Sequence, residues 1–347
     1  MKGVMSGIYK EFPRPGAEFR TELPIPQIGP RDILVKVRTT AICGTDLHIL
    51  PWSEYAQARI KPPMIFGHEF AGDVVETGRQ VTEIKVGDRV AGETHIPCNN
   101  CAQCLSDNRH ICENMKIIGV HTDGSFAQYI AFTADCAFKL PDDIDYTVGS
   151  LLEPMGVAMH GIDVARVEGK NVVVYGCGPI GLMAVGIAKA LKAARVTALD
   201  VFPKKLDAAK KMGADRVINS GETDAVSAIR DNSEPVDVVV DYTGSPQAIR
   251  EGMEAVKKGG CIVLVGLPNT NDLTLPITQD LIYKEVTMIG VTGRLMYKTW
   301  EQCVQIIRSG IFPIEFAIGE TYPLRDFQLA FDAIKDGMPG KALLLPW

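Results

Sequence analysis

The sequence lacks the two features that would place the protein in a membrane or on a nucleic acid. It has no uninterrupted apolar run of about 18 residues, the least that a membrane-spanning helix requires. Lysines and arginines form no cluster, and the net charge is −6. The segment 1–12 also lacks the apolar stretch of a secretory signal. We therefore expect a cytoplasmic protein whose partner is a small molecule rather than a nucleic acid or a membrane.

Internal repeats and low-complexity segments are also missing. This excludes a solenoid and a disordered chain. Apolar residues make up 46% of the sequence and charged residues 22%, as in an ordinary globular protein. With 347 residues, the chain is long enough for two domains, each with a core of its own.

The hydrophobic pattern changes partway along the chain. Short apolar runs such as 33–37 and 72–76, separated by proline and glycine, predict a mainly β domain over 1–155. Beyond residue 170, apolar strands alternate with amphipathic helices, which predicts an α/β domain with a doubly wound parallel sheet over 156–295. Its predicted strands are 171–175, 195–200, 236–240, 261–265 and 286–291, and its predicted helices are 179–192 and 204–212. One more helix is predicted at 301–308, within the C-terminal segment 296–347.

Four of the nine cysteines form a compact motif. Cys98, Cys101, Cys104 and Cys112 are separated by two, two and seven residues. Four thiolates at such spacings fit a closed tetrahedral zinc site, which stabilises the loop that holds it. The odd total suits a reducing compartment, where thiols bind metal instead of forming disulfides.

A second set of candidate ligands would leave one zinc coordination position open. Cys43 supplies a thiolate, His68 an imidazole, and either Glu69 or Glu153 a carboxylate. Zinc in an open site of this kind acts as a Lewis acid on a bound alcohol. Taken alone, Cys43 is more often a core residue and Glu69 an ordinary turn acid. Their combination with the nucleotide motif described below favours the metal site.

Two side chains close to Cys43 suggest a proton relay. Thr45 carries a hydroxyl that can hydrogen-bond the alcohol, and His48 carries an imidazole that can pass a proton to solvent. We therefore predict catalytic roles for Thr45, His48 and the nearby carboxylate Glu153.

A glycine-rich segment predicts a dinucleotide site. Gly176, Gly178 and Gly181 follow a predicted strand and open a predicted helix, and Asp200 ends the next strand. The glycines permit a tight turn, close approach of a pyrophosphate and close helix–strand packing. Asp200 can accept a hydrogen bond from a ribose 2′-hydroxyl and repels a 2′-phosphate, so NAD is favoured over NADP. Lys205 is either a contact to the adenine ribose or a solvated lysine.

In this order, the motifs resemble the zinc-dependent medium-chain dehydrogenase/reductase family over nearly the whole chain. The matching segments are 43–46, 67–69, 98–112, 153–154 and 176–181. The resemblance implies a GroES-like β domain that the C-terminal segment completes, a Rossmann domain, and an active site in the cleft between them. It also implies reversible alcohol oxidation by hydride transfer to a nicotinamide, with one catalytic and one structural zinc per chain. By analogy with prokaryotic members we expect a homotetramer.

Within the family, segment 92–96, the pair Gly293-Arg294 and the pair Thr299-Trp300 resemble the L-threonine 3-dehydrogenase branch. The resemblance implies oxidation of the L-threonine β-hydroxyl to 2-amino-3-ketobutyrate. It assigns zinc to Cys43, His68 and Glu69, with Glu153 close by, and the relay to Thr45 and His48. It places NAD contacts at Gly176, Gly178, Ile180, Gly181, Asp200, Lys205, Val265, Gly266, Leu267, Val291 and Thr292.

The substrate prediction has a competitor. Segment 155–158 reads Met-Gly-Val-Ala, and Val157 cannot supply the amide hydrogen bonds of the asparagine that is typical of the branch. A polyol or 2,3-butanediol dehydrogenase of the same family is therefore an alternative, and a non-catalytic NAD-binding protein is an alternative of another class. For an amino-acid substrate, Arg294 is a candidate partner of the carboxylate and Glu93 of the ammonium, although both fit surface ion pairs equally well. His95 is a further substrate candidate, although its spacing alone suits a surface or core histidine.

Overall fold

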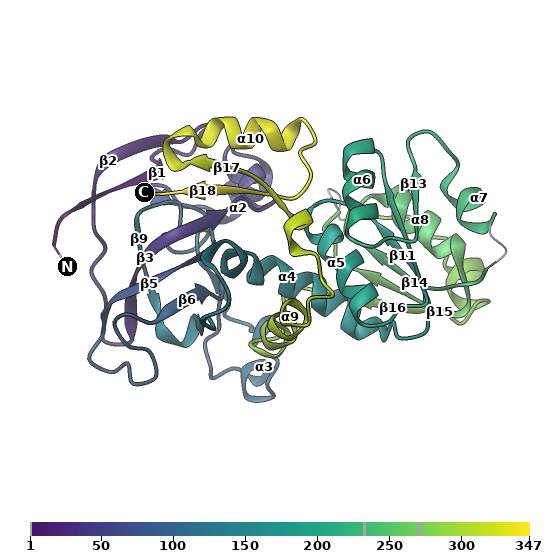
Figure 1. Cartoon of the computed structure of the whole chain (residues 1–347), viewed down its shortest axis with the longest axis horizontal. Coiled ribbons are helices and arrows are strands. Elements are labelled where there is room, and N and C mark those ends of the chain that lie inside the picture. Colours follow the sequence, from purple (N-terminus) through teal and green to yellow (C-terminus); the bar gives the residue numbers. More distant parts are fainter. Residues whose placement is uncertain (1, 232–233, 269–271) are drawn as a thin grey trace. The chain divides into compact units, whose positions relative to one another are not determined.

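A computed structural model describes residues 2–231, 234–268 and 272–347. The chain forms two compact units (Figure 1). Unit 1 consists of Met1–Glu153, Gly319–Asp336 and Lys341–Trp347, and unit 2 consists of Pro154–Ile318 and Gly337–Gly340. The long helix α4 (Tyr146–Ala165) contributes its first residues to unit 1 and the rest to unit 2.

Unit 1 is built on antiparallel strands. One sheet has the strand order β10-β6-β5-β3-β18-β17, with β9 also paired to β3, and another has the order β2-β1-β4. Its strands are β1 (Val4–Lys10), β2 (Glu18–Pro24), β3 (Asp32–Ala41), β4 (Met64–Ile65), β5 (Glu69–Thr77), β6 (Arg89–Gly92), β7 (His95–Ile96), β8 (Lys116–Ile117), β9 (Tyr129–Thr133), β10 (Ala137–Lys139), β17 (Ile318–Pro323) and β18 (Lys341–Leu345). Its shorter helices are α1 (Asp46–Ile49), α2 (Glu54–Arg59), α3 (Ala102–Leu105) and α10 (Phe327–Lys335).

The strand register of unit 1 brings distant segments together. Ala41 at the end of β3 pairs with Glu69 at the start of β5, so the residues just beyond these positions become neighbours. Strand β18 pairs with the other edge of β3, with Leu343 opposite Ala41. In Figure 1 the yellow C-terminal strand therefore lies beside the purple N-terminal strands. Cys43, His68 and Lys341 are positioned by these three strands.

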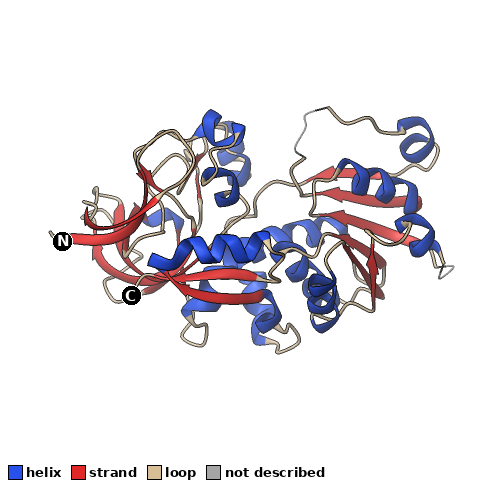
Figure 2. Ribbon diagram, turned by 90° about the horizontal axis from the view of Figure 1, so that it is seen from above, coloured by secondary structure: helices blue, strands red, loops and turns tan. Residues whose placement is uncertain are grey.

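Unit 2 contains a parallel sheet with the order β13-β12-β11-β14-β15-β16. The order reverses between β11 and β14, and in doubly wound folds ligands bind at the carboxyl ends of the strands next to that point. The strands are β11 (Asn171–Tyr175), β12 (Arg195–Asp200), β13 (Arg216–Asn219), β14 (Val236–Asp241), β15 (Val256–Leu264) and β16 (Thr287–Gly290). The helices are α5 (Pro179–Ala190), α6 (Pro203–Lys211), α7 (Ala225–Arg230), α8 (Pro246–Ala255) and α9 (Lys298–Arg308), and Figure 2 shows them in blue alongside the red strands.

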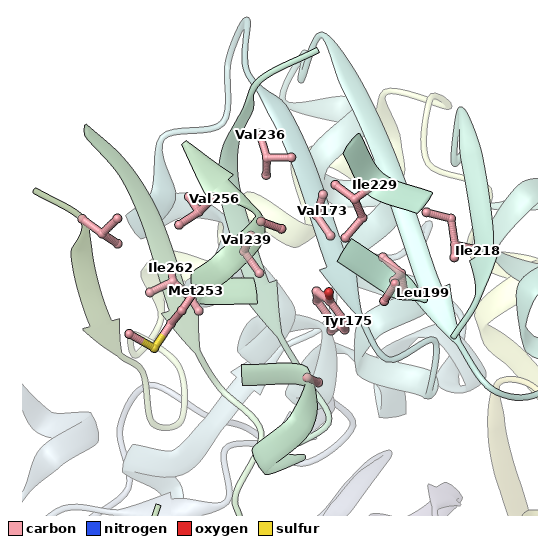
Figure 3. Packing of buried hydrophobic residues seen from close by; sticks show 14 residues of the cluster. Val173, Tyr175, Leu199, Ile218, Ile229, Val236, Val239, Met253, Val256 and Ile262 are labelled. Carbon is pink, nitrogen blue, oxygen red and sulfur yellow. The ribbon is translucent and has the colours of Figure 1, made fainter. Parts of the chain in front are cut away.

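Alternate residues of these strands form the core of unit 2. Successive side chains of a strand point to opposite faces, so residues two apart, such as Val173 and Tyr175, share the face that packs with helices α7 and α8. Figure 3 shows Val173, Tyr175, Leu199, Ile218, Val239 and Ile262 from the strands with Ile229 and Met253 from the helices. This packing fixes the strand ends that carry the nucleotide motif.

The expected α/β architecture is confirmed, and the predicted strands and helices of residues 171–308 are present with ends shifted by a few residues. The longer helices α4, α8 and α10 were not predicted, and neither were the short helices α1, α2, α3 and α7. Glycine and proline at Gly149, Pro154 and Gly156 masked the helical pattern of α4. Residues 296–318 lie in unit 2, and the chain returns to unit 1 at Gly319. In the described part of the chain, no helix is both long and apolar enough to cross a membrane.

Candidate functional site

Unit 1 brings three of the predicted metal ligands together. Single donor atoms of Cys43, His68 and Glu69 all lie within 4.8 Å of one another. The β3–β5 register explains this, because Cys43 follows β3, His68 directly precedes β5 and Glu69 opens it. Gly67 has φ of 89°, and a Cβ there would meet the ring of Phe126 at 2.3 Å. Only glycine therefore fits the turn that places His68.

A buried carboxylate, that of Asp46, holds the backbone of the candidate ligand Cys43. Asp46 is fully buried, and its Oδ2 accepts a hydrogen bond from the Cys43 backbone amide at 2.9 Å. Its Oδ1 has no hydrogen-bond partner among the described residues. Burial raises the pKa of Asp46, although the His68 charge acts in the opposite direction.

The electrostatics of this site favour a cation. The Nδ1 atom of His68 and the Oε2 atom of Glu69 are buried without hydrogen-bond partners among the described residues. Burial would lower the pKa of His68, but the thiolate of Cys43 and two nearby carboxylates raise it to about 10. The thiolate and carboxylates that stabilise the proton on His68 in this buried site would also stabilise a divalent metal ion. The metal ion offsets the same negative charge. Together with one sulfur, one nitrogen and one oxygen donor, the site fits zinc with a fourth position open.

Lys341 is part of this site, although it was not predicted from the sequence. Its Nζ donates to Glu69 Oε1 at 2.5 Å and to the carbonyl of Ile42 at 3.2 Å. The two paired side chains are almost completely buried, with exposed fractions of 2% and 0%. Burial lowers the pKa of Lys341, but the charges of Glu69, Cys43 and Glu153 and the hydrogen bond to Glu69 together raise it, so the lysine stays charged. Lys341 therefore takes one oxygen of Glu69 and leaves Oε2 for the metal group. The signal was a lone charged residue at the start of the apolar run 342–345.

The other catalytic candidates of unit 1 lie around this donor set. Glu153 is 5% exposed and close enough to influence the charges of His68 and Glu69, yet it is not among the three clustered donors. Thr45 precedes α1 without making a side-chain capping bond, so the helix does not use its hydroxyl. His48 lies in α1 and is exposed.

The four-cysteine motif forms a second donor set. One sulfur from each of Cys98, Cys101, Cys104 and Cys112 lies within 4.8 Å of the others. The sulfurs of Cys101 and Cys112 are 3.9 Å apart. Tetrahedral Zn–S bonds of about 2.3 Å place sulfurs roughly 3.8 Å apart, whereas a disulfide holds them about 2.05 Å apart. This arrangement fits a closed zinc site, and all nine cysteines are free.

Backbone amides donate hydrogen bonds to the cysteine sulfurs of the motif, which stabilises the thiolate form. The amides of Cys98 and Asn114 donate to Cys112 Sγ at 3.2 and 3.3 Å. Hydrogen bonds, the first from the Asn100 amide, lower the pKa of Cys98 to about 6, while burial raises that of Cys104 to about 12. Among the described residues, the local apolar cluster consists of the cysteines and Met115. A bound metal therefore replaces most of the hydrophobic core of this lobe.

In unit 2, the three glycines occupy distinct settings between β11 and α5. Gly176 has φ of 90°, a conformation that disfavours other residues. A Cβ on Gly181 would meet the Gly176 carbonyl at 1.8 Å, so the helix and the strand end pack closely. A Cβ on Gly178 would meet nothing and would project into open space, at the start of α5. That space, next to the N–H groups of a helix start, fits a pyrophosphate.

Asp200 faces a hollow beside this loop. Its Oδ2 accepts from the Cys177 amide at 2.8 Å and its Oδ1 from the Phe202 amide at 2.9 Å, which fixes the carboxylate. A cavity of about 250 Å³ lies next to it, lined by Tyr175, Gly176, Asp200, Thr243 and Ala248 among others. The size and the fixed acid fit the adenosine half of a dinucleotide.

The remaining predicted nucleotide contacts lie at the carboxyl ends of other strands. The amides of Val265 and Gly266 donate to the Asp241 carbonyl at 2.9 and 3.0 Å, and the Val291 amide donates to the Leu264 carbonyl at 2.9 Å. Leu267 and Thr292 are exposed, and Ile180 is half-buried. The Lys205 ammonium lies 4.6 Å from the Phe202 ring, in the first turn of α6.

The substrate candidates are placed differently from one another. His95 is half-buried in β7, and its amide donates to Glu93 Oε1 at 2.9 Å. Glu93 is fully buried, so this bond fixes the turn before His95. Arg294, in unit 2, is 1% exposed and packs against α4, where a Cβ on Gly156 would meet its Cδ at 3.0 Å.

Comparison with known proteins identifies the family of both parts of the chain. The Alcohol dehydrogenase GroES-like domain matches residues 29–142, and the Zinc-binding dehydrogenase family matches residues 179–309. L-threonine 3-dehydrogenase of Caldanaerobacter subterraneus subsp. tengcongensis is 42% identical over 100% of both chains. L-threonine 3-dehydrogenase of Bacillus velezensis is 41% identical, also over 100% of both chains.

Solved structures agree with this relationship at lower identity. Galactitol-1-phosphate dehydrogenase from Escherichia coli matches with a TM-score of 0.90 and 29% identity, over 99% of this chain and 100% of that one. 2R,3R-butanediol dehydrogenase from Bacillus subtilis matches with a TM-score of 0.87 and 26% identity, with the same coverage. The chain therefore belongs to the zinc-dependent medium-chain dehydrogenase/reductase family, in its L-threonine 3-dehydrogenase branch.

Proposed function

We propose that this protein oxidises the β-hydroxyl of L-threonine to the ketone of 2-amino-3-ketobutyrate, with NAD as the hydride acceptor. The observation that carries the proposal is the open donor set of Cys43, His68 and Glu69 in a chain that resembles threonine dehydrogenases from end to end. The hydride leaves C3 of threonine and the hydroxyl proton leaves separately, so the products are the keto acid, NADH and one proton.

The residues of unit 1 would hold the metal and move the proton. Cys43, His68 and the free oxygen of Glu69 would bind zinc, whose Lewis acidity makes the substrate hydroxyl easier to deprotonate. Thr45 takes up the hydroxyl proton as it gives its own proton toward His48, which is exposed and releases a proton to solvent. Glu153 adds negative charge beside the ligands and favours the metal. The four cysteines from Cys98 to Cys112 would hold the structural zinc.

The residues of unit 2 would bind NAD. The loop that carries Gly176, Gly178, Ile180 and Gly181 receives the pyrophosphate, and Asp200 accepts from the ribose hydroxyls. Lys205 lies beside the same ribose subsite. The nicotinamide half is contacted from the other strand ends, by Val265, Gly266, Leu267, Val291 and Thr292.

Two finer parts of the proposal concern the substrate and the assembly. Arg294 would pair with the threonine carboxylate and His95 would line the substrate site. The enzyme would work as a cytoplasmic homotetramer, with unit 1 as the catalytic domain and unit 2 as the nucleotide-binding domain. Light scattering coupled to size-exclusion chromatography measures the subunit number directly.

The test is the initial rate of NADH formation by zinc-replete protein, as kcat/KM, with L-threonine, D-threonine, 2,3-butanediol and sorbitol. We expect at least a tenfold preference for L-threonine, because the other three lack its carboxylate, its ammonium or its stereochemistry. A preference for the diol or the polyol would overturn the substrate and leave the chemistry in place. NADH binding without turnover of any alcohol would instead indicate a non-catalytic NAD-binding protein.

A further inference from the structure

Tyr55 touches both members of the proposed proton relay. It lies in α2, and its hydroxyl is close enough to the Thr45 hydroxyl to interact with it. Its ring lies 5.8 Å from the His48 imidazole, centroid to centroid, at a tilt of 40°. Thr45 makes no side-chain cap to α1, so this contact constrains a hydroxyl that the helix leaves unconstrained.

The turn that brings Tyr55 back over α1 is tightly held. The Ser53 amide donates to the His48 carbonyl at 3.1 Å, and Trp52 has φ of 61°, an uncommon conformation for a bulky residue. The buried ammonium of Lys10 lies 5.0 Å from the Trp52 ring and donates to the Leu50 carbonyl at 3.4 Å. A strained residue persists only where its surroundings fix it, and such positions concentrate at functional sites.

The Tyr55 ring is also fixed from within its own helix. The Arg59 guanidinium lies 4.4 Å from the ring centroid, and residues four apart in a helix are neighbours on its surface. A cation is attracted to the face of an aromatic ring. The half-buried Tyr55 ring is therefore contacted by both the Arg59 guanidinium and the His48 ring. The phenol oxygen is thereby held in place relative to Thr45.

We propose that Tyr55 is a positioning residue for the proton relay, an inference that rests on the proposed dehydrogenase function. A threonine side chain has three staggered rotamers, and a hydrogen bond to a fixed phenol selects one of them. The same ring supports the imidazole of His48. Tyr55 thus keeps the first proton acceptor and the group that releases the proton at a constant spacing through the catalytic cycle.

The test compares Tyr55→Phe with Tyr9→Phe. Tyr9 is a matched control, because it is also half-buried in unit 1 and carries an arginine, Arg20, 4.8 Å from its ring centroid. For Tyr55→Phe we expect a five- to tenfold fall in kcat, the effect of one lost hydrogen bond. We also expect a larger solvent deuterium isotope effect on kcat, with unchanged zinc content, NADH dissociation constant and melting temperature. Tyr9→Phe should match the wild type in every measurement.

Other outcomes overturn the inference. A Tyr55→Phe enzyme with wild-type kcat and isotope effect shows that the hydroxyl positions nothing. Loss of zinc or of thermal stability in that variant shows a structural role for the residue. If the wild type oxidises a diol but not L-threonine, the substrate proposal has failed, and the same comparison made on the diol still decides the role of Tyr55.

Discussion

At the scale of single residues, the buried pair of Lys341 and Glu69 shapes the metal centre. An ion pair removed from water is stable only as a pair, so each side chain depends on the other. Lys341 neutralises one carboxylate of a strongly acidic site by pairing with Oε1 of Glu69, and Oε2 has no hydrogen-bond partner among the described residues. A chain without Lys341 would leave Glu69 free to rotate and would increase the repulsion within the site.

We predict that Lys341→Met lowers the free energy of unfolding of the metal-free protein by about 3–5 kcal/mol, because it leaves the Glu69 charge buried and unpaired. Urea unfolding in the presence of a chelator measures this. The Lys341→Met/Glu69→Gln double variant should recover part of the loss. Lys335→Met is the control, since Lys335 pairs with Asp332 on the surface, with 62% of its side chain exposed. An equal effect of the two single substitutions would contradict the prediction.

Asp200 should decide between the two nicotinamide cofactors. We predict that Asp200→Asn lowers kcat/KM for NAD about tenfold, because a charged acceptor of the ribose hydroxyls is lost. The same change should raise the ratio of NADP to NAD activity, because the 2′-phosphate is no longer repelled. Steady-state kinetics with both cofactors measure the ratio. Asp207→Asn, at an exposed site of α6, should change neither value, and an unchanged ratio in Asp200→Asn would refute the assignment.

Arg294 provides a test of the substrate carboxylate. We predict that Arg294→Gln lowers kcat/KM for L-threonine by a factor of about 30, or roughly 2 kcal/mol, because a buried charged hydrogen bond is lost. L-threoninamide lacks the carboxylate, so its kcat/KM should be low in the wild type and little changed in the variant. If both substrates lose activity equally, Arg294 only packs against Gly156 and α4.

At the scale of elements, the cysteine lobe is the segment that depends most on metal. Its own apolar cluster is little more than the cysteines and Met115. We predict that Cys101→Ser removes one of two zinc ions per chain and speeds amide exchange in 98–112 about 100-fold, because metal binding supplies the folding energy of the lobe. Cys261→Ser, in β15, should keep both ions. Retained zinc and slow exchange in Cys101→Ser would contradict the prediction.

The elements that could be predicted from the sequence are those whose signals are local. Runs such as 171–175 and 236–240 are apolar along their length, as buried parallel strands are, and Gly176 marks the turn that follows. The candidate ligands Cys43 and His68 were likewise recognisable from short motifs. Lys341 was not, because its partner lies 272 positions away and only the β3–β18 pairing brings them together. Tyr55 was missed for a similar reason, since a turn at Trp52 carries it back to His48.

At the scale of the whole molecule, the candidate zinc sites and the candidate dinucleotide site belong to different units. Both zinc donor sets lie in unit 1, and the glycine loop with the Asp200 cavity lies in unit 2. The predicted ligands Cys43, His68 and Glu69 lie at the ends of the antiparallel strands β3 and β5, where the register fixes their positions. The predicted nucleotide contacts lie at the carboxyl edge of a parallel sheet. Unit 1 would therefore bind zinc at the ends of its strands, and unit 2 would bind NAD at the carboxyl edge of its sheet.

This division predicts separate responses to the two ligands in one protein. NADH at about 100 times its dissociation constant should stabilise the native protein by about 2.7 kcal/mol. In hydrogen exchange it should protect segments 176–181 and 241–245. Removal of zinc by a chelator should instead speed exchange in 43–48, 67–69 and 98–112, where the donor sets lie. Mass spectrometry of peptides from the holoenzyme, the chelated protein and the NADH complex measures both patterns. Protection by NADH confined to unit 1, or chelator effects confined to unit 2, would contradict the assignment of the two sites.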